Sequence, residues 1–263
     1  MEPTKANAKK SILAYLLPPA LWLGAWQLGA FWVERAVEGR GNELLLPYPA
    51  SVLAALMELL PSGAFWATVG ATLLRVAVGL AAGIFLGTLL AGVTCSWVWL
   101  HRLLSPAIRI VRATPVASFI LLVLLWTGRN TVPAVISALM VLPVVWENLV
   151  RGIQAADPQL LELAQAYRFS RWKTLRLIYL PSLRPYFLSA VITSTGLAWK
   201  SGVAAEAICW PRPGIGTQIY NTKLYLEIPS LFAWTAVVVA LSLVLERLLR
   251  LALGRWKGGG GDD

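Results

Sequence analysis

Charged residues are scarce in this sequence. Only 14% of its 263 residues are charged, whereas 57% are hydrophobic and the mean hydropathy is +0.65. Soluble domains carry about 25% charged residues, so a soluble fold of this size could not bury so many apolar side chains. The composition therefore predicts an integral membrane protein. The 13 tryptophans agree with this prediction, because tryptophan is enriched at membrane interfaces.

Cysteine and histidine are nearly absent. The two cysteines, Cys95 and Cys209, stand far apart in apolar surroundings, and His101 is the one histidine. These residues predict neither a disulfide framework nor a metal site. The sequence also lacks HExxH, GxSxG and a pair of carboxylates on adjacent apolar segments. We therefore predict no catalytic residue and no metal ligand in this chain.

A phosphate-binding loop is missing as well. The nearest match to a Walker A loop lies at residues 196–201, where Lys200 precedes a serine. A Walker A loop requires glycine immediately before the lysine and again five positions further back. Those positions hold Trp199 and Ser194 here. Any ATP and magnesium used with this protein are therefore expected on a separate polypeptide.

Six apolar stretches approach the ~20 residues that a helix needs to cross the hydrocarbon core of a bilayer. They are residues 12–33, 64–90, 113–128, 130–146, 185–205 and 228–245. The first follows a basic N-terminus, residues 1–11, as in a secretory signal. Its apolar run is long for such a signal and lacks a clear cleavage site. We therefore expect six transmembrane helices, with the first retained.

The basic residues predict the orientation. If the N-terminus is cytoplasmic, 16 of the 23 lysines and arginines fall in cytoplasmic segments and five in external ones, with Arg75 and Lys200 inside spans. Lysine and arginine are enriched on the cytoplasmic side of membrane proteins. Both termini are therefore predicted to be cytoplasmic. Topology accounts for the basic pI, and no nucleic-acid partner is expected.

Small residues recur in the second predicted span. Gly79, Gly83, Gly87 and Ala91 follow one another at intervals of four. This spacing lets two helix backbones approach closely in lipid. The contact could lie within one subunit or between two copies, and we favour the first.

The segment between the fourth and fifth spans is too long for a simple turn. Asp157–Pro158 predicts a helix start, because a capping carboxylate is followed by proline in the first turn. A short helix through Tyr167 follows, and Ser170 can cap a second helix that reaches Tyr179. Leu180–Pro181 is then expected to break this second helix. The pattern predicts a compact pair of helices on the cytoplasmic face.

This segment resembles the EAA loop of bacterial ABC importer permeases, and we call residues 157–181 the EAA loop. The family pattern is Glu-Ala-Ala, a glycine six positions after the glutamate, and Ile-x-Leu-Pro beginning sixteen positions after it. Glu162 and Ala164 match the start, and residues 178–181 match the end. Leu163 replaces the first alanine. Arg168 replaces the glycine, where a positive φ would cost an arginine about 1 kcal/mol.

Further motifs resemble the nitrate, sulfonate, taurine and bicarbonate branch of this family. They lie at residues 46–52, 113–115, 196–206 and 214–216. The resemblance covers roughly residues 44–250 and implies one permease domain over residues 1–263, with a family core at about 60–250. The implied fold is all-α, with six transmembrane helices in the type I, MetI-like arrangement and cytoplasmic coupling helices. The glycine-rich residues 256–263 are predicted to be disordered.

The resemblance also implies partners. In this family the EAA loop docks into a groove of a separate ATPase, and the expected docking residues are Glu162, Ala164, Ala166, Tyr167, Arg168, Ser170, Arg171 and Trp172. A homodimer of the permease in the bacterial cell membrane, two ATPase copies that hold ATP and magnesium, and an extracytoplasmic solute-binding protein complete such an importer. The implied solute is a small anion or zwitterion such as nitrate, an aliphatic sulfonate or taurine.

Polar residues inside spans are costly and mark functional sites. The candidates for the translocation path are Lys200, Glu206, Asn148 and Arg75. Lys200 could attract an anion or pair with another helix. It stands six positions before Glu206, a spacing that excludes a direct pair on one helix face. The loop of residues 211–216 could receive the binding protein or serve as a structural turn.

Two alternatives remain open from the sequence. A secondary transporter driven by an ion gradient would need intramembrane carboxylates, for which Glu206 and Glu147 are the candidates. It would also leave the EAA loop without a role. A permease of the same family could instead carry a vitamin precursor such as a thiamine pyrimidine or riboflavin.

Overall fold

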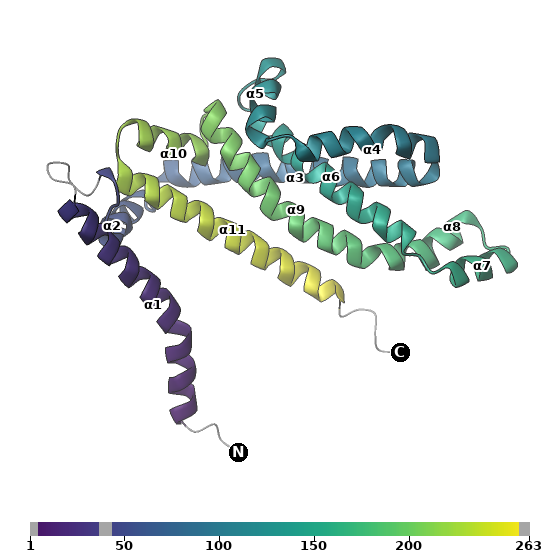
Figure 1. Cartoon of the computed structure of the whole chain (residues 1–263), viewed down its shortest axis with the longest axis horizontal. Helices are drawn as coiled ribbons and strands as arrows, with labels where there is room; N and C mark the ends of the chain where they lie inside the picture. Colours follow the sequence, from purple (N-terminus) through teal and green to yellow (C-terminus); the bar gives the residue numbers. More distant parts are fainter. Residues whose placement is uncertain (1–4, 37–43, 258–263) are drawn as a thin grey trace. The chain divides into compact units, whose positions relative to one another are not determined.

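The computed structural model describes residues 5–36 and 44–257, and within these ranges every regular element is helical (Figure 1). The elements are α1 (Lys5–Ala36), α2 (Pro49–Leu59), α3 (Gly63–Ser96), α4 (Val98–Ala113), α5 (Val116–Trp126), α6 (Val132–Gln154), α7 (Pro158–Ala166), α8 (Arg171–Thr174), η2 (Leu175–Tyr179), α9 (Leu180–Cys209), α10 (Ile215–Leu224) and α11 (Ile228–Lys257). Of the predicted disordered tail, residues 256–257 end α11, and the remainder lies outside the described residues. Residues 1–4 of the basic N-terminus lie outside them too.

The chain divides into two compact units. The first combines Met1–Trp66 with Gln218–Val237, and the second combines Ala67–Thr217 with Val238–Asp263. The boundaries fall inside α3, α10 and α11, so these helices run from one unit into the other.

Aromatic contacts organise the first unit. Trp26 on α1 donates from Nε1 to the carbonyl of Pro47, just before α2, at 3.0 Å. Its ring lies 5.8 Å from that of Phe232, and the rings of Phe65 and Trp234 lie 5.2 Å apart. Such pairs contribute beyond the area they bury. They tie α1, the start of α3 and the start of α11 together.

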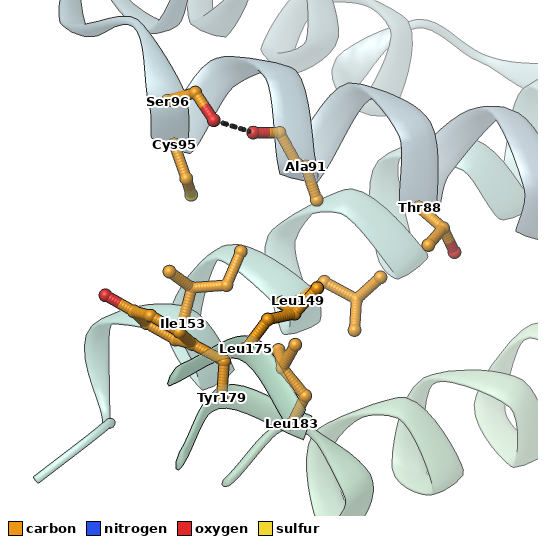
Figure 2. Close-up of a pocket in the computed structure, with 10 residues that line it drawn as sticks. Thr88, Ala91, Cys95, Ser96, Leu149, Ile153, Leu175, Tyr179 and Leu183 are labelled. Atoms are coloured by element: carbon orange, nitrogen blue, oxygen red, sulfur yellow. Dashed lines mark hydrogen bonds between the residues drawn. The ribbon is translucent and has the colours of Figure 1, made fainter. Parts of the chain in front are cut away.

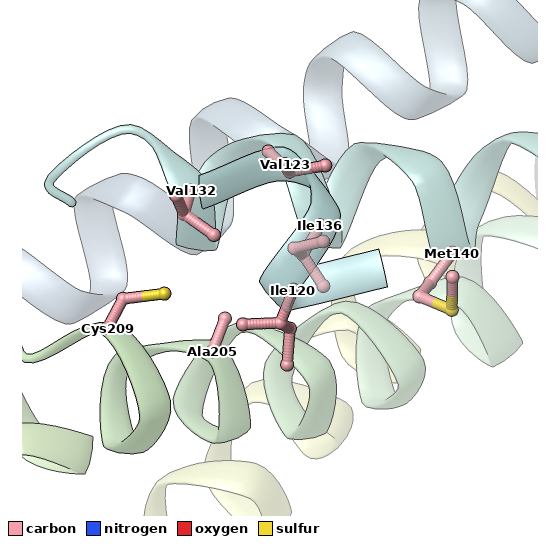
Figure 3. Close-up of a cluster of buried hydrophobic side chains, with 7 residues drawn as sticks. All are labelled: Ile120, Val123, Val132, Ile136, Met140, Ala205 and Cys209. Carbon is pink, nitrogen blue, oxygen red and sulfur yellow. The ribbon is translucent and has the colours of Figure 1, made fainter. Parts of the chain in front are cut away.

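The core of the second unit lies where α6 packs along α9 (Figure 1). α5 folds onto the same pair, and side chains from all three helices form one buried apolar cluster (Figure 3). The cluster consists of Ile120, Val123, Val132, Ile136, Met140, Ala205 and Cys209. α6 is buried on most of its circumference, because α3, α5 and α9 all pack against it. It is the central helix of this unit.

Glycines bring α3 against α6. A Cβ added at Gly83 would lie 2.6 Å from the Cβ of Val141, and one at Gly87 would lie 2.9 Å from the Cβ of Val145. At Gly79 an added Cβ would overlap the carbonyl oxygen of Ala134. No side chain fits at these distances, so glycine is required for the close approach. The preferred interpretation of the glycine spacing, a contact within one subunit, is confirmed.

Three of the described helices, α3, α6 and α11, are long and apolar enough to cross a membrane. They correspond to the second, fourth and sixth predicted spans. α1 and α9, which contain the first and fifth predicted spans, are not among them, so the count of six is only partly confirmed. The third prediction, residues 113–128, contains only the 11-residue α5. This helix meets α4 at an angle of 107°, and the two together have the length and composition of either one broken span or a re-entrant loop. The bend lies at Thr114, which precedes Pro115 and adopts an extended backbone with ψ of 133°, because proline disfavours the helical conformation in the residue before it.

Candidate functional site

The EAA loop begins with two helices whose caps the sequence predicts correctly. Asp157 precedes α7, and its carboxylate accepts a hydrogen bond from the backbone N–H of Gln159 at 2.8 Å. Ser170 precedes α8, and its hydroxyl accepts from the N–H of Lys173 at 3.3 Å. Each cap satisfies a donor that the first helical turn leaves unpaired. Local sequence therefore determines where both helices begin.

The turn between the two helices has the geometry of a glycine turn, although arginine occupies the position. Arg168 has φ of 51°. Its N–H donates to the carbonyl of Gln165 at 3.0 Å, and the N–H of Phe169 donates to the carbonyl of Ala164 at 2.8 Å. This pair of hydrogen bonds defines a Schellman motif, which usually ends a helix at glycine. The departure of Arg168 from the family pattern therefore changes the residue and leaves the turn intact.

A small core stabilises the EAA loop. Ala156, Ala164 and Ile178 are buried together, and Phe169 and Tyr179 pack against them, as does Leu161. The ammonium of Lys173 lies 4.0 Å from the centre of the Phe169 ring, a cation–π contact. The core is separate from the cluster around α6 and α9. The two short helices therefore form a folded unit with an apolar centre of their own.

The surface of the EAA loop carries most of the residues expected to dock a partner. Tyr167 is 71% exposed and Trp172 is 70% exposed. The remaining exposed members of that set are Glu162, Ala166, Arg168, Ser170 and Arg171. Ala164 faces inward and is only 4% exposed, so its small side chain lets α7 pack on Ile178. Large exposed aromatic side chains beside arginines are typical of protein-binding surfaces.

The helix break expected at Leu180–Pro181 is absent, and this prediction was wrong. η2 is a π-helix that leads directly into α9, and the N–H of Leu180 donates to the carbonyl of Leu175 five residues back. The wider π-turn admits Pro181 without the carbonyl clash that proline causes inside a regular α-helix. The EAA loop is therefore joined to α9 without an interruption.

A buried ion pair joins α3 to α9. Arg75 donates from Nη1 to Oε1 of Glu206 at 2.8 Å, and the Glu206 side chain has no solvent exposure. The other carboxylate oxygen of Glu206 accepts from the hydroxyl of Thr72 at 2.9 Å and from the N–H of Gly216 at 3.1 Å. A buried charge is tolerated only with partners of this kind. The structure thus brings together two residues that the sequence proposed separately for the path.

The same residues hold the loop between α9 and α10. Arg75 also donates to the carbonyl of Pro213 at 2.6 Å, and the hydroxyl of Thr72 accepts from the N–H of Ile215 at 3.0 Å. A Cβ at Gly214 would lie 3.0 Å from the carboxylate carbon of Glu206, so a larger residue would crowd the carboxylate. The loop is therefore fixed to α3 and α9 by two charge-assisted hydrogen bonds, those of Arg75 and Glu206, and by the neutral one to Thr72.

Lys200 lies outside this network. It is exposed on α9, on the same side of the helix as the exposed Ser189, Thr193 and Ala204. An added Cβ at Gly196 would meet nothing within 4 Å. This side of α9 is therefore open, and its side chains are small or polar, which is unusual for a surface in contact with lipid.

A second ion-pair cluster, which was not predicted from the sequence, links α4 to α6. Glu147 pairs with two arginines. Arg112, in the last turn of α4, is one of them, and Arg151 is the other, with its Nη2 2.6 Å from Oε1 of Glu147. Glu147 and Arg151 stand four residues apart, which is the visible signal for a pair on one helix. Asn148 lies beside them and donates from Nδ2 to the carbonyl of Val144 at 2.8 Å. The cluster carries a net positive charge.

These features together define a class of protein. Apolar helices long enough to cross a membrane, with a folded two-helix loop continuous with α9, describe a helical membrane protein. Residues 79–257 match the family model of the binding-protein-dependent transport system inner membrane component. The match spans more than half of the chain, and the chain belongs to this family of ABC transporter permeases.

Individual relatives agree with the family. The chain is 28% identical to a Bacillus subtilis protein named for aliphatic sulfonates transport, the permease SsuC, over 248 residues that cover 92% of this chain and 87% of the relative. It is 28% identical to the riboflavin transport system permease protein RibX of Chloroflexus aurantiacus, with 92% and 90% covered. A solved bacterial ABC transporter involved in importing the acidic polysaccharide alginate has a TM-score of 0.62, with 17% identity and 95% and 96% covered.

The likeness to the solved structure shows the fold, which is the all-helical, MetI-like permease fold. The family and the apolar helices identify a multi-pass protein of a bacterial membrane. Permeases of this family work with an ATPase and a solute-binding protein.

Proposed function

We propose that this chain is the path-forming subunit of an ATP-driven importer for a small anionic or zwitterionic solute. In this proposal two copies form the path, both termini are cytoplasmic, and two copies of a partner ATPase bind and hydrolyse ATP with magnesium. A binding protein delivers the solute from outside. The observation that carries the proposal is the EAA loop, which is folded around its own core, exposes aromatic and basic side chains, and continues into α9.

The docking surface follows from the exposed side chains of the EAA loop. Tyr167 and Trp172 each offer a large apolar area with a polar group at its edge, the combination that anchors protein interfaces. Arg168 and Arg171 are exposed beside them and suit carboxylates on the partner. The partner is therefore an ATPase whose groove has an apolar floor and an acidic rim.

The connection between η2 and α9 supports a mechanical role for the EAA loop. Because no break separates the two elements, a displacement of the loop is passed to α9 along a continuous helix. α9 in turn packs along α6 and carries Lys200. Rotation or tilt of α9 would thus change the path when the ATPase closes on ATP.

Lys200 supplies the argument for an anion. An ammonium group inside a span is costly in lipid and almost always faces a water-filled cavity or a partner. Its exposed neighbours Ser189 and Thr193 offer hydroxyl groups on the same side. We propose that this side of α9 lines the path, with Asn148 of α6 as a further polar contributor. Sulfonates, nitrate, taurine and bicarbonate all carry the negative charge that Lys200 would attract.

Arg75 and Glu206 would serve the external end of the path. They pair with each other, and both form hydrogen bonds with the loop of residues 211–216. We propose that they keep this loop in the shape that receives the binding protein. A second candidate solute is a riboflavin-like vitamin, which the relative RibX favours.

The docking proposal is tested by replacing Tyr167 with glutamate. Tyr225 provides the matched control, because it is also 71% exposed but lies in the turn between α10 and α11. Loss of an aromatic anchor costs about 2 kcal/mol, so Tyr167→Glu should weaken co-purification with the ATPase about 30-fold. Tyr225→Glu should leave it unchanged. Equal recovery of the ATPase with both variants would refute the docking role.

A further inference from the structure

A cavity of about 470 Å³ lies between the EAA loop and the end of α3 (Figure 2). One wall is α3, with small side chains, and the opposite wall comes from α6, η2 and the first turn of α9, with large ones. The lining residues are Thr88, Ala91, Gly92, Cys95, Ser96, Leu149, Ile153, Leu175, Tyr179 and Leu183. The arrangement leaves open space where the neighbouring helices would otherwise interdigitate.

The cavity begins where the close contact between α3 and α6 ends. Gly87 is the last glycine that touches α6, whereas an added Cβ at Gly92 would meet nothing within 4 Å. Beyond it, the two helices are joined through Trp146, whose Nε1 donates to the hydroxyl of Thr94 at 2.9 Å. α3 is therefore held on α6 on both sides of Gly92, and the cavity wall that does not belong to this pair of helices comes from η2 and the first turn of α9.

The cavity is apolar in character. The hydroxyls of Thr88 and Ser96 donate to carbonyls within α3, at 2.7 Å from Ile84 and 2.9 Å from Gly92. They are thereby satisfied by their own helix and do not require water. Loss of packing on apolar walls is unfavourable, so bringing the walls together lowers the free energy.

Tyr179 belongs to two structures at once. It packs against the core of the EAA loop and it lines the cavity. Leu175, at the other end of η2, also lines the cavity and is 39% exposed. Both sit on a π-helix, an element that is often found at functional sites and that holds one extra residue in its turn. A change of the π-turn would move these two side chains relative to α3.

We propose that this cavity is the space into which Leu175 and Tyr179 move when the ATPase closes. The proposal rests on the proposed function, since it requires an ATPase on the EAA loop. In this proposal, coupling between the ATPase and α9 requires the cavity to be empty. A filled cavity would allow docking and hydrolysis and would block the movement of α9.

Gly92 allows the cavity to be filled without strain inside α3. The test uses the assembled complex of permease, ATPase and binding protein in proteoliposomes, with the series Gly92→Ala, Gly92→Leu and Gly92→Phe. Gly70→Leu is the matched control, because Gly70 lies on the same helix and an added Cβ there also meets nothing within 4 Å. A larger side chain at position 92 obstructs the space sterically. We therefore expect uptake to fall with side-chain size, by about tenfold for leucine, while the ATPase still co-purifies.

The outcomes separate this proposal from the proposed function. If the ATPase does not co-purify with the unaltered chain, the proposed function fails. If it co-purifies and Gly92→Leu transports as well as Gly70→Leu, the cavity proposal alone fails. An acyl chain that merely fills the space would give this second result, because leucine would replace it without blocking movement.

Cys95 provides a measurement that does not depend on a filled cavity. It lines the cavity and is partly exposed, so its reaction with a maleimide reports access. In a Cys209→Ala chain, labelling should slow about fivefold or more when the complex is held in the ATP-bound state, and Cys95→Ala defines the background. Equal labelling rates with and without ATP would overturn the proposal.

Discussion

Nη1 of Arg75 lies 2.8 Å from Oε1 of Glu206, and this contact joins α3 to α9 across 131 positions of sequence. It is the one ion pair of the described residues with a fully buried carboxylate. The same guanidinium reaches the carbonyl of Pro213. Loop and helices are therefore held by one set of charges.

Breaking this pair from one side should be costly. Arg75→Ala would leave the Glu206 carboxylate buried without its cation, which typically costs about 3–5 kcal/mol. The control is Arg250→Ala, which removes an exposed pair with Glu246 worth about 0.3–0.5 kcal/mol. Thermal unfolding in detergent measures both. Arg75→Ala should lower Tm by several degrees more than Arg250→Ala, and equal shifts would contradict a stabilising role for the buried pair.

The pair also predicts a rescue. Removing both charges together, as in Arg75→Met with Glu206→Leu, leaves no uncompensated charge and should be less harmful than Arg75→Ala alone. The double variant should have a Tm close to that of the unaltered chain, but the loop of residues 211–216 should no longer be held in place. Proteolysis at the loop of residues 211–216 would then increase while Tm stays near that of the unaltered chain.

Replacing Arg168 with glycine should stabilise the turn between α7 and α8. The φ of 51° at Arg168 costs an L-residue about 1 kcal/mol, which glycine avoids. Arg168→Gly should therefore slow hydrogen exchange in residues 158–179 relative to Arg168→Ala, a comparison that keeps the loss of charge constant. If both variants exchange alike, the turn carries no strain. Docking of the ATPase is a separate readout, because both variants remove the arginine.

The glycine contact between α3 and α6 predicts a sharp steric effect. In Gly83→Ala the new methyl would stand 2.6 Å from the Cβ of Val141, and overpacking of this kind costs about 1–3 kcal/mol. Gly70→Ala adds the same methyl to α3 where nothing lies within 4 Å. Gly83→Ala should lower Tm, and Gly70→Ala should leave it unchanged or raise it. The reverse order would show that α3 and α6 are not in contact.

Lys200 should set the charge preference of transport. Its attraction for an anion at contact distance is worth about 1–4 kcal/mol. Lys200→Gln should therefore raise KM for uptake of an anionic solute such as taurine or a sulfonate by about tenfold, and Lys200→Arg should largely preserve it. Lys223→Gln, which removes an exposed lysine of α10, is the control. An unchanged KM in Lys200→Gln would exclude Lys200 from the path.

Local sequence signals predicted where the helices of the EAA loop begin, but they did not predict which of its residues are buried. Asp157 and Ser170 mark their helices because capping depends on the nearest backbone groups alone. Ala164 was assigned to the docking surface because its smallness is visible in the sequence. Which side of α7 it occupies depends on Ile178 and Phe169, which only the fold brings together.

The remaining differences also come from long-range packing. Pro181 signals a helix break, but a π-turn and the packing of α9 accommodate it. Pro115 does mark a break, yet no local rule gives the 107° between α4 and α5. Arg75 and Glu206 were each identified as costly in a membrane, and their mutual pairing required the approach of α3 to α9.

The source of energy tests the central claim most directly. The measurement is solute uptake into proteoliposomes that contain the permease, its ATPase and the binding protein, with the ATPase Walker A lysine either intact or replaced by alanine. The account predicts uptake that requires ATP and is abolished by the lysine substitution, with no uptake by the permease alone under an ion gradient. Uptake that persists without ATP hydrolysis, driven by an ion gradient, would contradict it and would identify a secondary transporter.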